Sequence, residues 1–509
     1  MKEKIISIDQ GTTSTRSVLY DKKGDFISSA QQEFNQFFPK DGWVEHNPED
    51  IWQSVLFTLQ KLVKESGITS SEIASIGITN QRETALIWNK KTGKPIHNAI
   101  VWQDRRTSEF CNELGSYENI IHKKTGLTID PYFSATKIHW LLKNVEGAKE
   151  LALNGDLLFG TVDTYLIWKL TEGRCHKTDI TNASRTMLFN IAEQQWDNDL
   201  LDIFEIPRQI LPEVCDNVSD YGMTEVLGGE VGIGGVAGDQ QAALIGQCCF
   251  DPGDVKSTYG TGCFMMVNSG DKILYSENKL LSTIGYRIDG KTTYALEGSI
   301  FVAGSAIQWL RDGLNFFEDS FETEAMSKIA SSDSRVLVIP ALTGLGAPYW
   351  DAEARGAIFG ITRDTSKEDI TKATLESVAF QSKDLVEAMK KDNATFKKLM
   401  IDGGMVNNNW FCQQLANTLQ VEVSRPAIIE TTSLGAAFLA GLSADLYDSL
   451  SSLKETKVID KVFFPKAEED RYHELSLIHI SEPTRRRGIS VGGVVVEKKR
   501  GGGGGGGGG

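Results

Sequence analysis

A polar stretch at residues 9–16 (Asp-Gln-Gly-Thr-Thr-Ser-Thr-Arg) has the composition of a phosphate-binding loop. Its glycine permits close backbone approach to a ligand, and its hydroxyls can donate hydrogen bonds to phosphate oxygens. Its arginine supplies positive charge, and its aspartate can hold Mg²⁺ through water. The residues concerned are Gly11, Thr12, Thr13, Ser14, Arg16 and Asp9. A polar hairpin turn has the same composition, so this stretch alone leaves both interpretations open.

A second turn of this kind, Tyr259-Gly-Thr-Gly262, lies in the second half of the chain. Apolar runs predict a strand on each side of it, at residues 255–259 and 263–267. The strands predicted at residues 5–8 and 17–20 flank the first turn in the same way. The repeat predicts two related halves with a boundary near residues 246–253, and two facing turns that could hold one nucleotide.

Residues 285–292 match the nucleotide-binding pattern GxxxxGK[ST], but the neighbouring sequence does not suit it. That motif requires a strand before it and a helix after it. Residues 282–288 and 292–296 instead alternate as two strands around Asp289-Gly290, which is a hairpin turn signal. We therefore expect a hairpin here and no phosphate contact from Lys291.

The elements that must position these turns follow an α/β pattern. Hydrophobic periodicity predicts long helices and short strands in alternation. The predicted helices cover residues 48–66, 367–391 and 409–419, and the predicted strands cover residues 73–78, 85–88, 100–102, 336–340 and 398–401.

The composition favours small-molecule chemistry in a large protein. The 509 residues carry a net charge of −15, which opposes binding to nucleic acid or to anionic lipid. The seven cysteines form no Cys-x-x-Cys pair, as expected of reduced thiols. The chain shows no signal-peptide pattern and no apolar run of about 20 residues that could span a membrane. These features predict a cytoplasmic location. Residues 475–509, which end in nine glycines, resemble non-native sequence and are expected to be a disordered tail.

Several longer motifs resemble those of the FGGY carbohydrate kinases, a branch of the actin-like ATPase superfamily. Residues 132–141 resemble the first signature of that family, and residues 356–376 resemble the second. The resemblance extends from about residue 3 to 474. Four further motifs are similar to those of the glycerol-phosphorylating members of the family: residues 42–46, 80–84, 100–106 and 237–242.

This resemblance implies two ribonuclease H-like (actin-like ATPase) α/β domains with an interdomain active-site cleft. Residues 1–246 would bind the polyol and phosphate, and residues 250–444 would bind the nucleotide. The implied reaction is ATP-dependent phosphorylation of glycerol to sn-glycerol 3-phosphate, the first step of glycerol catabolism, with Mg²⁺ as cofactor. A homo-oligomer, dimer or tetramer, is also implied.

The resemblance assigns roles to particular residues. Asp239 would be the general base and, with Asp9, would hold Mg²⁺. The substrate pocket would comprise Arg82, Glu83, Trp102, Tyr132, Asp239, Gln240 and Phe264. The nucleotide site would comprise Thr12, Thr13, Ser14, Arg16, Thr261, Gly304, Gln308, Gly404 and Asn408.

Two alternatives stay open at this stage. A kinase of the same family could act on xylulose or gluconate instead. An actin-like or chaperone-like ATPase could use the nucleotide only as a conformational switch, although that function leaves Arg82, Glu83 and Asp239 without a purpose. The segment 221–235 lacks the Gly-Gly-Thr-Arg regulatory loop of some relatives.

Overall fold

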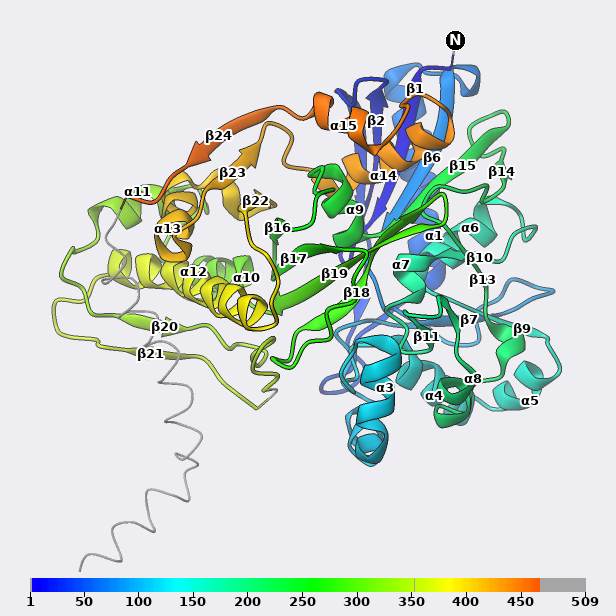
Figure 1. Ribbon diagram of the computed structural model, residues 1–509, viewed down its shortest axis with the longest axis horizontal. Helices are drawn as coiled ribbons and strands as arrows, with labels where there is room; N and C mark the ends of the chain where they lie inside the picture. Colours follow the sequence, from blue (N-terminus) through cyan, green and yellow to red (C-terminus); the bar gives the residue numbers. More distant parts are fainter. Residues whose placement is uncertain (1, 352, 467–509) are drawn as a thin grey trace, which may run out of the picture.

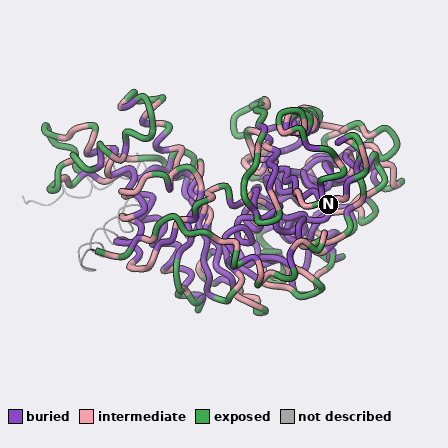
Figure 2. The backbone as a smooth tube through the Cα atoms, turned by 90° about the horizontal axis from the view of Figure 1, so that it is seen from above, coloured by how far each residue is buried: buried purple, intermediate pink, exposed green. Residues whose placement is uncertain are grey.

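Two α/β lobes, each built around one large β-sheet, make up the molecule (Figure 1). The computed structural model describes residues 2–351 and 353–466. The tail predicted at residues 475–509 lies outside the described residues. Buried segments run through the interior of both lobes and across the region where the lobes meet (Figure 2).

The sheet of the first lobe has the strand order β14-β15-β6-β1-β2-β3. β1, β2 and β3 form an antiparallel meander, and β6 and β15 continue the sheet parallel to β1. The strands are β1 (Lys4–Gln10), β2 (Ser14–Asp21), β3 (Phe26–Glu33), β6 (Ile73–Asn80), β14 (Met223–Thr224) and β15 (Val231–Gly238).

The sheet of the second lobe has the order β18-β19-β17-β16-β22-β23-β24. Within it, β19-β17-β16-β22-β23 repeats the arrangement of β3-β2-β1-β6-β15, with the same antiparallel and parallel pairings. The expectation of two related ribonuclease H-like halves is confirmed. The strands are β16 (Asp254–Tyr259), β17 (Cys263–Gly270), β18 (Leu281–Ile288), β19 (Lys291–Ile300), β22 (Lys398–Asp402), β23 (Val423–Pro426) and β24 (Ile459–Phe463).

Three long helices begin and end where the sequence predicted: α1 (Pro48–Ser66), α12 (Lys367–Lys391) and α13 (Asn409–Leu419). Local capping explains the agreement. The side chain of Asn47 accepts from the backbone N–H of Glu49, and Gly67 ends α1 in the left-handed conformation. Ser366 and Asp369 form a capping box at the start of α12.

Two further helices, α9 (Asp239–Gly246) and α14 (Thr431–Ser443), join the lobes. A Cβ atom on Gly246 would lie 2.0 Å from the carbonyl oxygen of Thr431, and one on Gly435 would lie 1.8 Å from that of Ala242. Only glycine allows this approach. α14 comes late in the chain but lies against β1 and β6 of the first lobe (Figure 1). No local pattern in the sequence predicts this return.

Smaller elements cover the edges of both lobes. In the first lobe they are β4 (Gln36–Phe37), β5 (Glu45–His46), β7 (Leu86–Asn89), β8 (Ala99–Ile100), α2 (Ser108–Glu113), α3 (Glu118–Thr125), α4 (Ser134–Asn144), α5 (Ala148–Leu153), β9 (Leu157–Gly160), α6 (Val162–Leu170), β10 (Lys177–Asp179), α7 (Ile180–Ala183), β11 (Phe189–Asn190), β12 (Gln195–Trp196), α8 (Asn198–Ile203) and β13 (Glu213–Cys215). In the second they are α10 (Gly304–Gln308), α11 (Glu322–Ile329), β20 (Leu337–Ile339) and β21 (Ala357–Phe359). α15 (Leu450–Leu453) lies beside α14 and β2 of the first lobe (Figure 1). The strand predicted at residues 100–102 ends at Ile100, because the chain turns at Trp102.

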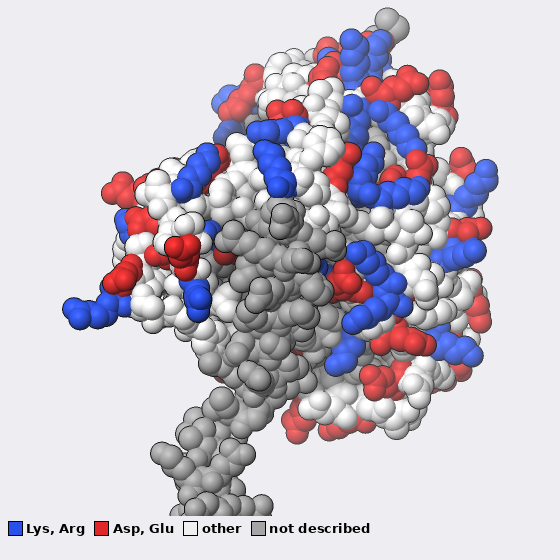
Figure 3. Space-filling view, turned by 60° about the vertical axis from the view of Figure 1, so that its left-hand side comes forward, with Lys and Arg blue, Asp and Glu red and all other residues white. Residues whose placement is uncertain are grey.

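The structure shows how charged side chains and cysteines are distributed. On the face shown in Figure 3, Lys and Arg side chains alternate with Asp and Glu side chains. All seven cysteines lie in the described part of the chain and are free. Among the described residues, no helix combines the length and the apolar character that a bilayer span requires.

The GxxxxGK[ST] sequence forms the hairpin that its flanks predicted. β18 and β19 pair antiparallel, with Ile288 opposite Lys291. Asp289 and Gly290 make the turn with φ angles of 51° and 72°. The lysine is exposed at the start of a strand, so the helix amino terminus that a phosphate site requires is missing from this position.

Replacing the hairpin lysine tests this conclusion. We expect Lys291→Ala to change the Michaelis constant for ATP by less than about twofold, because an exposed turn lysine contributes little binding energy. Steady-state kinetics at varied ATP measures the effect. A rise of tenfold, which corresponds to about 1.4 kcal/mol of lost binding, would contradict the hairpin assignment.

Candidate active site

Arg82 and Glu83 directly follow β6 and lie in the interior between the lobes. Their exposed fractions are 3% and 1%, so both side chains are shielded from solvent. Glu83 has a φ of 60°, an uncommon backbone conformation for a residue with a side chain. The hydroxyl of Ser134, the first residue of α4, donates to the carbonyl oxygen of Glu83 at 3.0 Å and holds this conformation.

Glu297, on β19 of the second lobe, is the carboxylate that fixes Arg82. Its oxygens accept from Arg82 Nη1 at 2.6 Å and Nη2 at 3.0 Å, and from Arg185 Nη2 at 3.2 Å. Arg185 in turn donates through Nε to Glu83 at 2.6 Å. Burial opposes the charged form of Glu297, but the guanidinium groups of Arg185 and Arg82 lower its pKa to about 2. The four side chains form a buried network of paired charges.

Asp239 is the first residue of α9 and is held by Arg82. Its Oδ1 lies 3.0 Å from Arg82 Nε and accepts from the backbone N–H of Gln240 at 2.7 Å. Both contacts involve Oδ1, and the side chain stays 31% exposed, which leaves Oδ2 as the oxygen that can accept a proton. Burial raises the pKa of Asp239 above its ordinary value, and the positive charges of Arg82 and Lys256 offset part of the rise.

Aromatic side chains from both lobes surround this group. Trp102 packs edge-on against Tyr132, with ring centroids 5.7 Å apart, and against Phe264, with centroids 6.2 Å apart. Arg82 lies over the ring of Phe264 at 6.0 Å. The carbonyl oxygen of the Gln240 side chain accepts from Lys256. The structure therefore brings all seven predicted substrate-pocket residues together.

The predicted phosphate loop lies between β1 and β2. Arg16 pairs with Glu430 at 2.7 Å, and Ser14 accepts from the side chain of Gln31. Burial raises the pKa of Asp9 to about 7, and the negative charges of Glu430 and Asp239 add to the rise. The positive charge of Arg16 opposes it. The two predicted Mg²⁺ ligands, Asp9 and Asp239, are thus close enough to repel each other.

A divalent cation near both carboxylates would favour their ionised forms. Within the described residues, no group of three or more His, Cys, Asp and Glu side chains is arranged to enclose a metal ion. Two carboxylates acting through water, with further oxygens from nucleotide phosphates, are the donor set that Mg²⁺ commonly takes.

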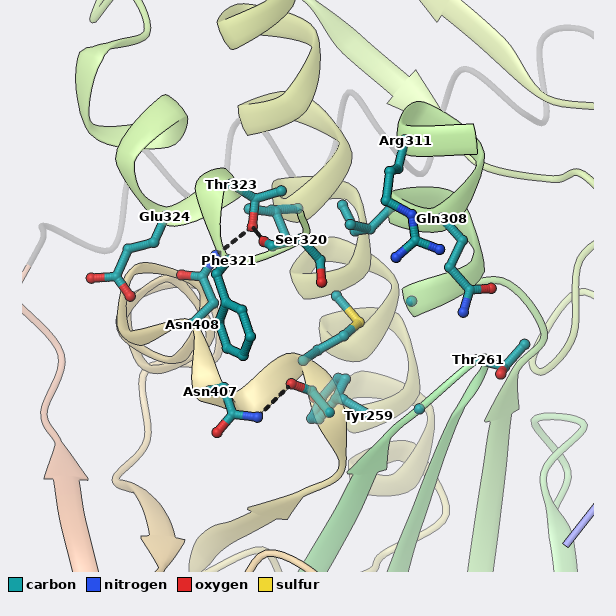
Figure 4. A pocket seen from close by; sticks show the side chains of 16 residues that line it. Tyr259, Thr261, Gln308, Arg311, Ser320, Phe321, Thr323, Glu324, Asn407 and Asn408 are labelled. Carbon is teal, nitrogen blue, oxygen red and sulfur yellow. Dashed lines mark hydrogen bonds between the residues drawn. The ribbon is translucent and has the colours of Figure 1, made fainter. Parts of the chain in front are cut away.

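A cavity of about 420 Å³ lies in the second lobe between α10, α11 and the start of α13 (Figure 4). Five of the nine predicted nucleotide-binding residues line it: Thr261, Gly304, Gln308, Gly404 and Asn408. The other four, Thr12, Thr13, Ser14 and Arg16, belong to the first lobe and do not line it. Asn408 caps α13 by accepting from the N–H of Phe411, and its amide donates to Thr323 at 3.1 Å.

Glycines bring the backbone close at the mouth of this cavity. Gly304 packs against the turn that contains Gly260, and a Cβ atom on Gly304 would lie 2.5 Å from the carbonyl oxygen of Gly260. Gly403 has a φ of 89°, and a Cβ there would lie 2.6 Å from the carbonyl oxygen of Tyr259. Gly404, in contrast, faces open space, so a ligand can approach its backbone. At the mouth of the cavity the backbone of Gly404 is therefore open to a ligand, whereas Gly304 and Gly403 are closely packed.

Sequence reasoning missed several residues of both parts of the site. Arg185, Glu297 and Lys256 gave no local signal, because their partners are distant in the sequence. Lys137 lies within the first family signature, residues 132–141, which does not indicate its role: its buried ammonium donates to the carbonyl oxygens of Pro131, Tyr132 and Phe133. The cavity also includes unpredicted side chains, namely Ile307, Arg311, Ser320, Phe321, Thr323, Glu324, Leu375, Met405 and Asn407. Of these, Arg311 could have been found from its position one helical turn after Gln308.

Comparisons with known proteins agree with this architecture. The sequence model described as "FGGY family of carbohydrate kinases, N-terminal domain" matches residues 4–246, and that of the C-terminal domain matches residues 255–444. The glycerol kinase of Marinomonas sp. (strain MWYL1) is 57% identical over 473 residues, which are 92% of this chain and 96% of the relative. The glycerol kinase of Bacillus cereus (strain AH187) is 54% identical over 481 residues, which are 93% and 97%.

Solved structures show the same fold. The crystal structure of Plasmodium falciparum glycerol kinase with ADP superimposes with a TM-score of 0.88 at 37% identity, covering 96% of this chain and 98% of that one. Gluconate kinase from Lactobacillus acidophilus superimposes with a TM-score of 0.85 at 25% identity, covering 95% and 98%. The fold and the site thus define a kinase with two ribonuclease H-like lobes. The chain belongs to the FGGY family of carbohydrate kinases.

Glu297→Gln tests the buried charge network. The substitution keeps the shape but leaves two buried guanidinium groups without their shared counter-ion, so we expect the free energy of unfolding to fall by about 3 kcal/mol or more. The folded-state pKa of Glu297, about 2, lies below its unfolded value. Its contribution is therefore present above the unfolded pKa and lost as the pH falls through about 2, and the difference between the two proteins should shrink in acid.

Urea denaturation at several pH values measures this effect. Glu3→Gln is the matched control, because Glu3 forms an exposed pair with Lys22 and its replacement should leave the stability almost unchanged. A Glu297→Gln variant as stable as the control variant would contradict the proposed importance of the network.

Proposed function

We propose that this protein transfers the γ-phosphoryl group of ATP to glycerol and so forms sn-glycerol 3-phosphate, the first step of glycerol catabolism. The observation that carries the proposal is the convergence of Arg82, Glu83 and Asp239 with aromatic rings from both lobes. The glycerol kinases of 54–57% identity, which cover more than nine-tenths of the chain, support the same substrate.

The proposed pocket suits a small polyol. Arg82 can donate to a hydroxyl, the carboxylate of Glu83 can accept from one, and the rings of Trp102 and Phe264 can pack on the carbon chain. Arg82 and Glu83 are already oriented by Glu297 and Arg185. A site that pairs each hydroxyl in this way rejects analogues that lack one, because its buried polar groups are then left without partners.

Asp239 has the properties of a general base for the reacting hydroxyl. Its pKa is raised above that of an ordinary aspartate and therefore lies closer to neutral pH, which makes the carboxylate a better proton acceptor. Arg82 and the backbone N–H of Gln240 hold one oxygen, and this fixes the direction of the other. Removal of the proton would make the hydroxyl oxygen a better nucleophile towards the γ-phosphorus.

The nucleotide would lie in the cavity of the second lobe, with its phosphates directed towards the turn at residues 11–13. Thr261 and the backbone near Gly404 would contact phosphate, and Gln308 would contact the ribose or base. Mg²⁺, held by Asp9 and Asp239 through water, would supply charge neutralisation at the phosphates. Arg16 would add positive charge from the first lobe.

Other functions agree less well with the observations. The gluconate kinase of similar fold shares only 25% identity with this chain, against 57% for a glycerol kinase. A nucleotide switch without a small substrate would not require a buried Arg82–Glu83–Glu297 network beside Asp239. The cytoplasmic location and the homo-oligomer, dimer or tetramer, stay predictions.

A coupled assay of ADP release tests the substrate. We expect turnover with glycerol to exceed turnover with xylulose or gluconate by at least about 10⁴-fold in kcat/KM, since the site would pair hydroxyls at fixed positions. Comparable rates with xylulose would favour the sugar-kinase alternative. ADP release that is indifferent to every added polyol would favour the switch.

Asp239→Asn tests the base. The variant keeps the size of the side chain and one acceptor oxygen, so glycerol should still bind, but kcat should fall at least about 10²-fold. If Asp239 served only to begin α9, asparagine would replace it almost without effect. Asp41→Asn, an exposed turn aspartate, is the control. A folded Asp239→Asn variant that keeps more than about a third of the kcat would contradict the assignment, because a general base contributes far more.

A further inference from the structure

One hydrogen bond joins the proposed polyol pocket to the proposed phosphate loop. The indole Nε1–H of Trp102 donates to Oγ1 of Thr12 at 3.0 Å. The ring of Trp102 meanwhile packs against Tyr132 and Phe264 in the pocket. A single side chain therefore contacts both parts of the site.

A second path runs through buried polar groups between the same two places. The backbone N–H of Trp102 donates to Thr84 Oγ1 at 3.3 Å, and that hydroxyl donates to Gln81 Oε1 at 2.9 Å. Gln81 Nε2 then donates to the carbonyl oxygen of Gly11 at 3.0 Å. Because Gly11 precedes Thr12, these bonds close a circuit that links the phosphate loop to Trp102. A displacement of either end would strain these hydrogen bonds.

The donor and acceptor capacity of the Thr12 hydroxyl determines which group donates and which accepts in this link. A hydroxyl has one proton to donate and two lone pairs to accept. The indole N–H can only donate, so it occupies a lone pair of Thr12 and leaves the hydroxyl proton available. Phosphate oxygens are acceptors. Trp102 therefore prepares Thr12 to donate to a terminal phosphate, and a bound phosphate favours the ring position that the hydrogen bond requires.

We propose that the Trp102–Thr12 hydrogen bond couples the binding of the polyol to the binding of the nucleotide's terminal phosphate. The inference rests on the proposed function of the site and makes Trp102 a positioning residue for the phosphate loop as well as a contact for the substrate. Coupling of this kind is reciprocal: the nucleotide raises the affinity for the polyol by the factor by which the polyol raises that for the nucleotide.

Calorimetry measures the coupling directly. The dissociation constant for glycerol is determined with and without a saturating, non-hydrolysable ATP analogue carrying Mg²⁺. We expect the analogue to tighten glycerol binding by at least about fivefold in the unaltered protein. Trp102→Phe keeps an aromatic ring but removes the N–H, and Thr12→Val keeps the shape but removes the hydroxyl. Each should reduce the coupling factor by at least about twofold, towards a factor of one, because one neutral hydrogen bond is lost.

The double variant distinguishes the loss of one shared hydrogen bond from two independent effects of the substitutions on the coupling. If the two groups act through their mutual bond, Trp102→Phe with Thr12→Val should reduce the coupling no further than either change alone. Thr12→Ser restores the hydroxyl and should restore the coupling, which a purely structural role of the methyl group would not predict. Trp168→Phe, on α6 and packed against Trp88, makes the same substitution away from the site and should leave the coupling unchanged.

Three results would overturn the inference: no coupling in the unaltered protein, an unaltered coupling factor in folded Trp102→Phe, or independent losses that multiply in the double variant. Circular dichroism establishes folding, and if Trp102→Phe does not fold, Thr12→Val and Thr12→Ser carry the test alone. An unaltered protein that fails to phosphorylate glycerol contradicts the proposed function. A protein that phosphorylates glycerol, but whose coupling does not depend on Trp102 and Thr12, contradicts only this inference.

Discussion

The buried carboxylate of Glu297 is the constraint on which the rest of the site depends. It comes from the second lobe and accepts from Arg82 and Arg185 of the first lobe. Arg82 holds Asp239, and Arg185 holds Glu83. Burial of an unpaired guanidinium is costly, so each of these side chains keeps its direction as long as its partners are present. The network thereby orients the proposed base and the proposed polyol contacts before any ligand binds.

The repeated fold explains why chemistry is concentrated between the lobes. In both sheets the first two strands are joined by a short polar turn, at residues 11–13 and at residues 260–262. The glycine-mediated contact of α9 with α14 and the apolar cluster that includes Ile5, Ala242 and Met400 connect the two sheets. A nucleotide in the second lobe can therefore present its phosphates to residues of the first.

Electrostatics distinguish the two aspartates of the cleft. Asp239 has the neighbouring positive charges of Arg82 and Lys256, whereas Asp9 lies near the negative charges of Glu430 and Asp239. Burial is the main cause that raises the pKa of Asp9 to about 7, and these negative charges add to the rise while Arg16 opposes it. A divalent cation would lower this pKa. In the proposed reaction both carboxylates hold Mg²⁺, and Asp239 also acts as the base.

The sequence by itself determined the features that depend on neighbours along the chain. It set the bounds of α1, α12 and α13, because caps such as Asn47 and Ser366 act within one turn. It set the β18–β19 hairpin and the repeated turns for the same reason. Only the tertiary structure decided which charges are paired: Arg82 and Glu297 are 215 residues apart. It also placed α14 on the first lobe and Trp102 beside Thr12, because burial and packing depend on the whole chain and leave no local pattern.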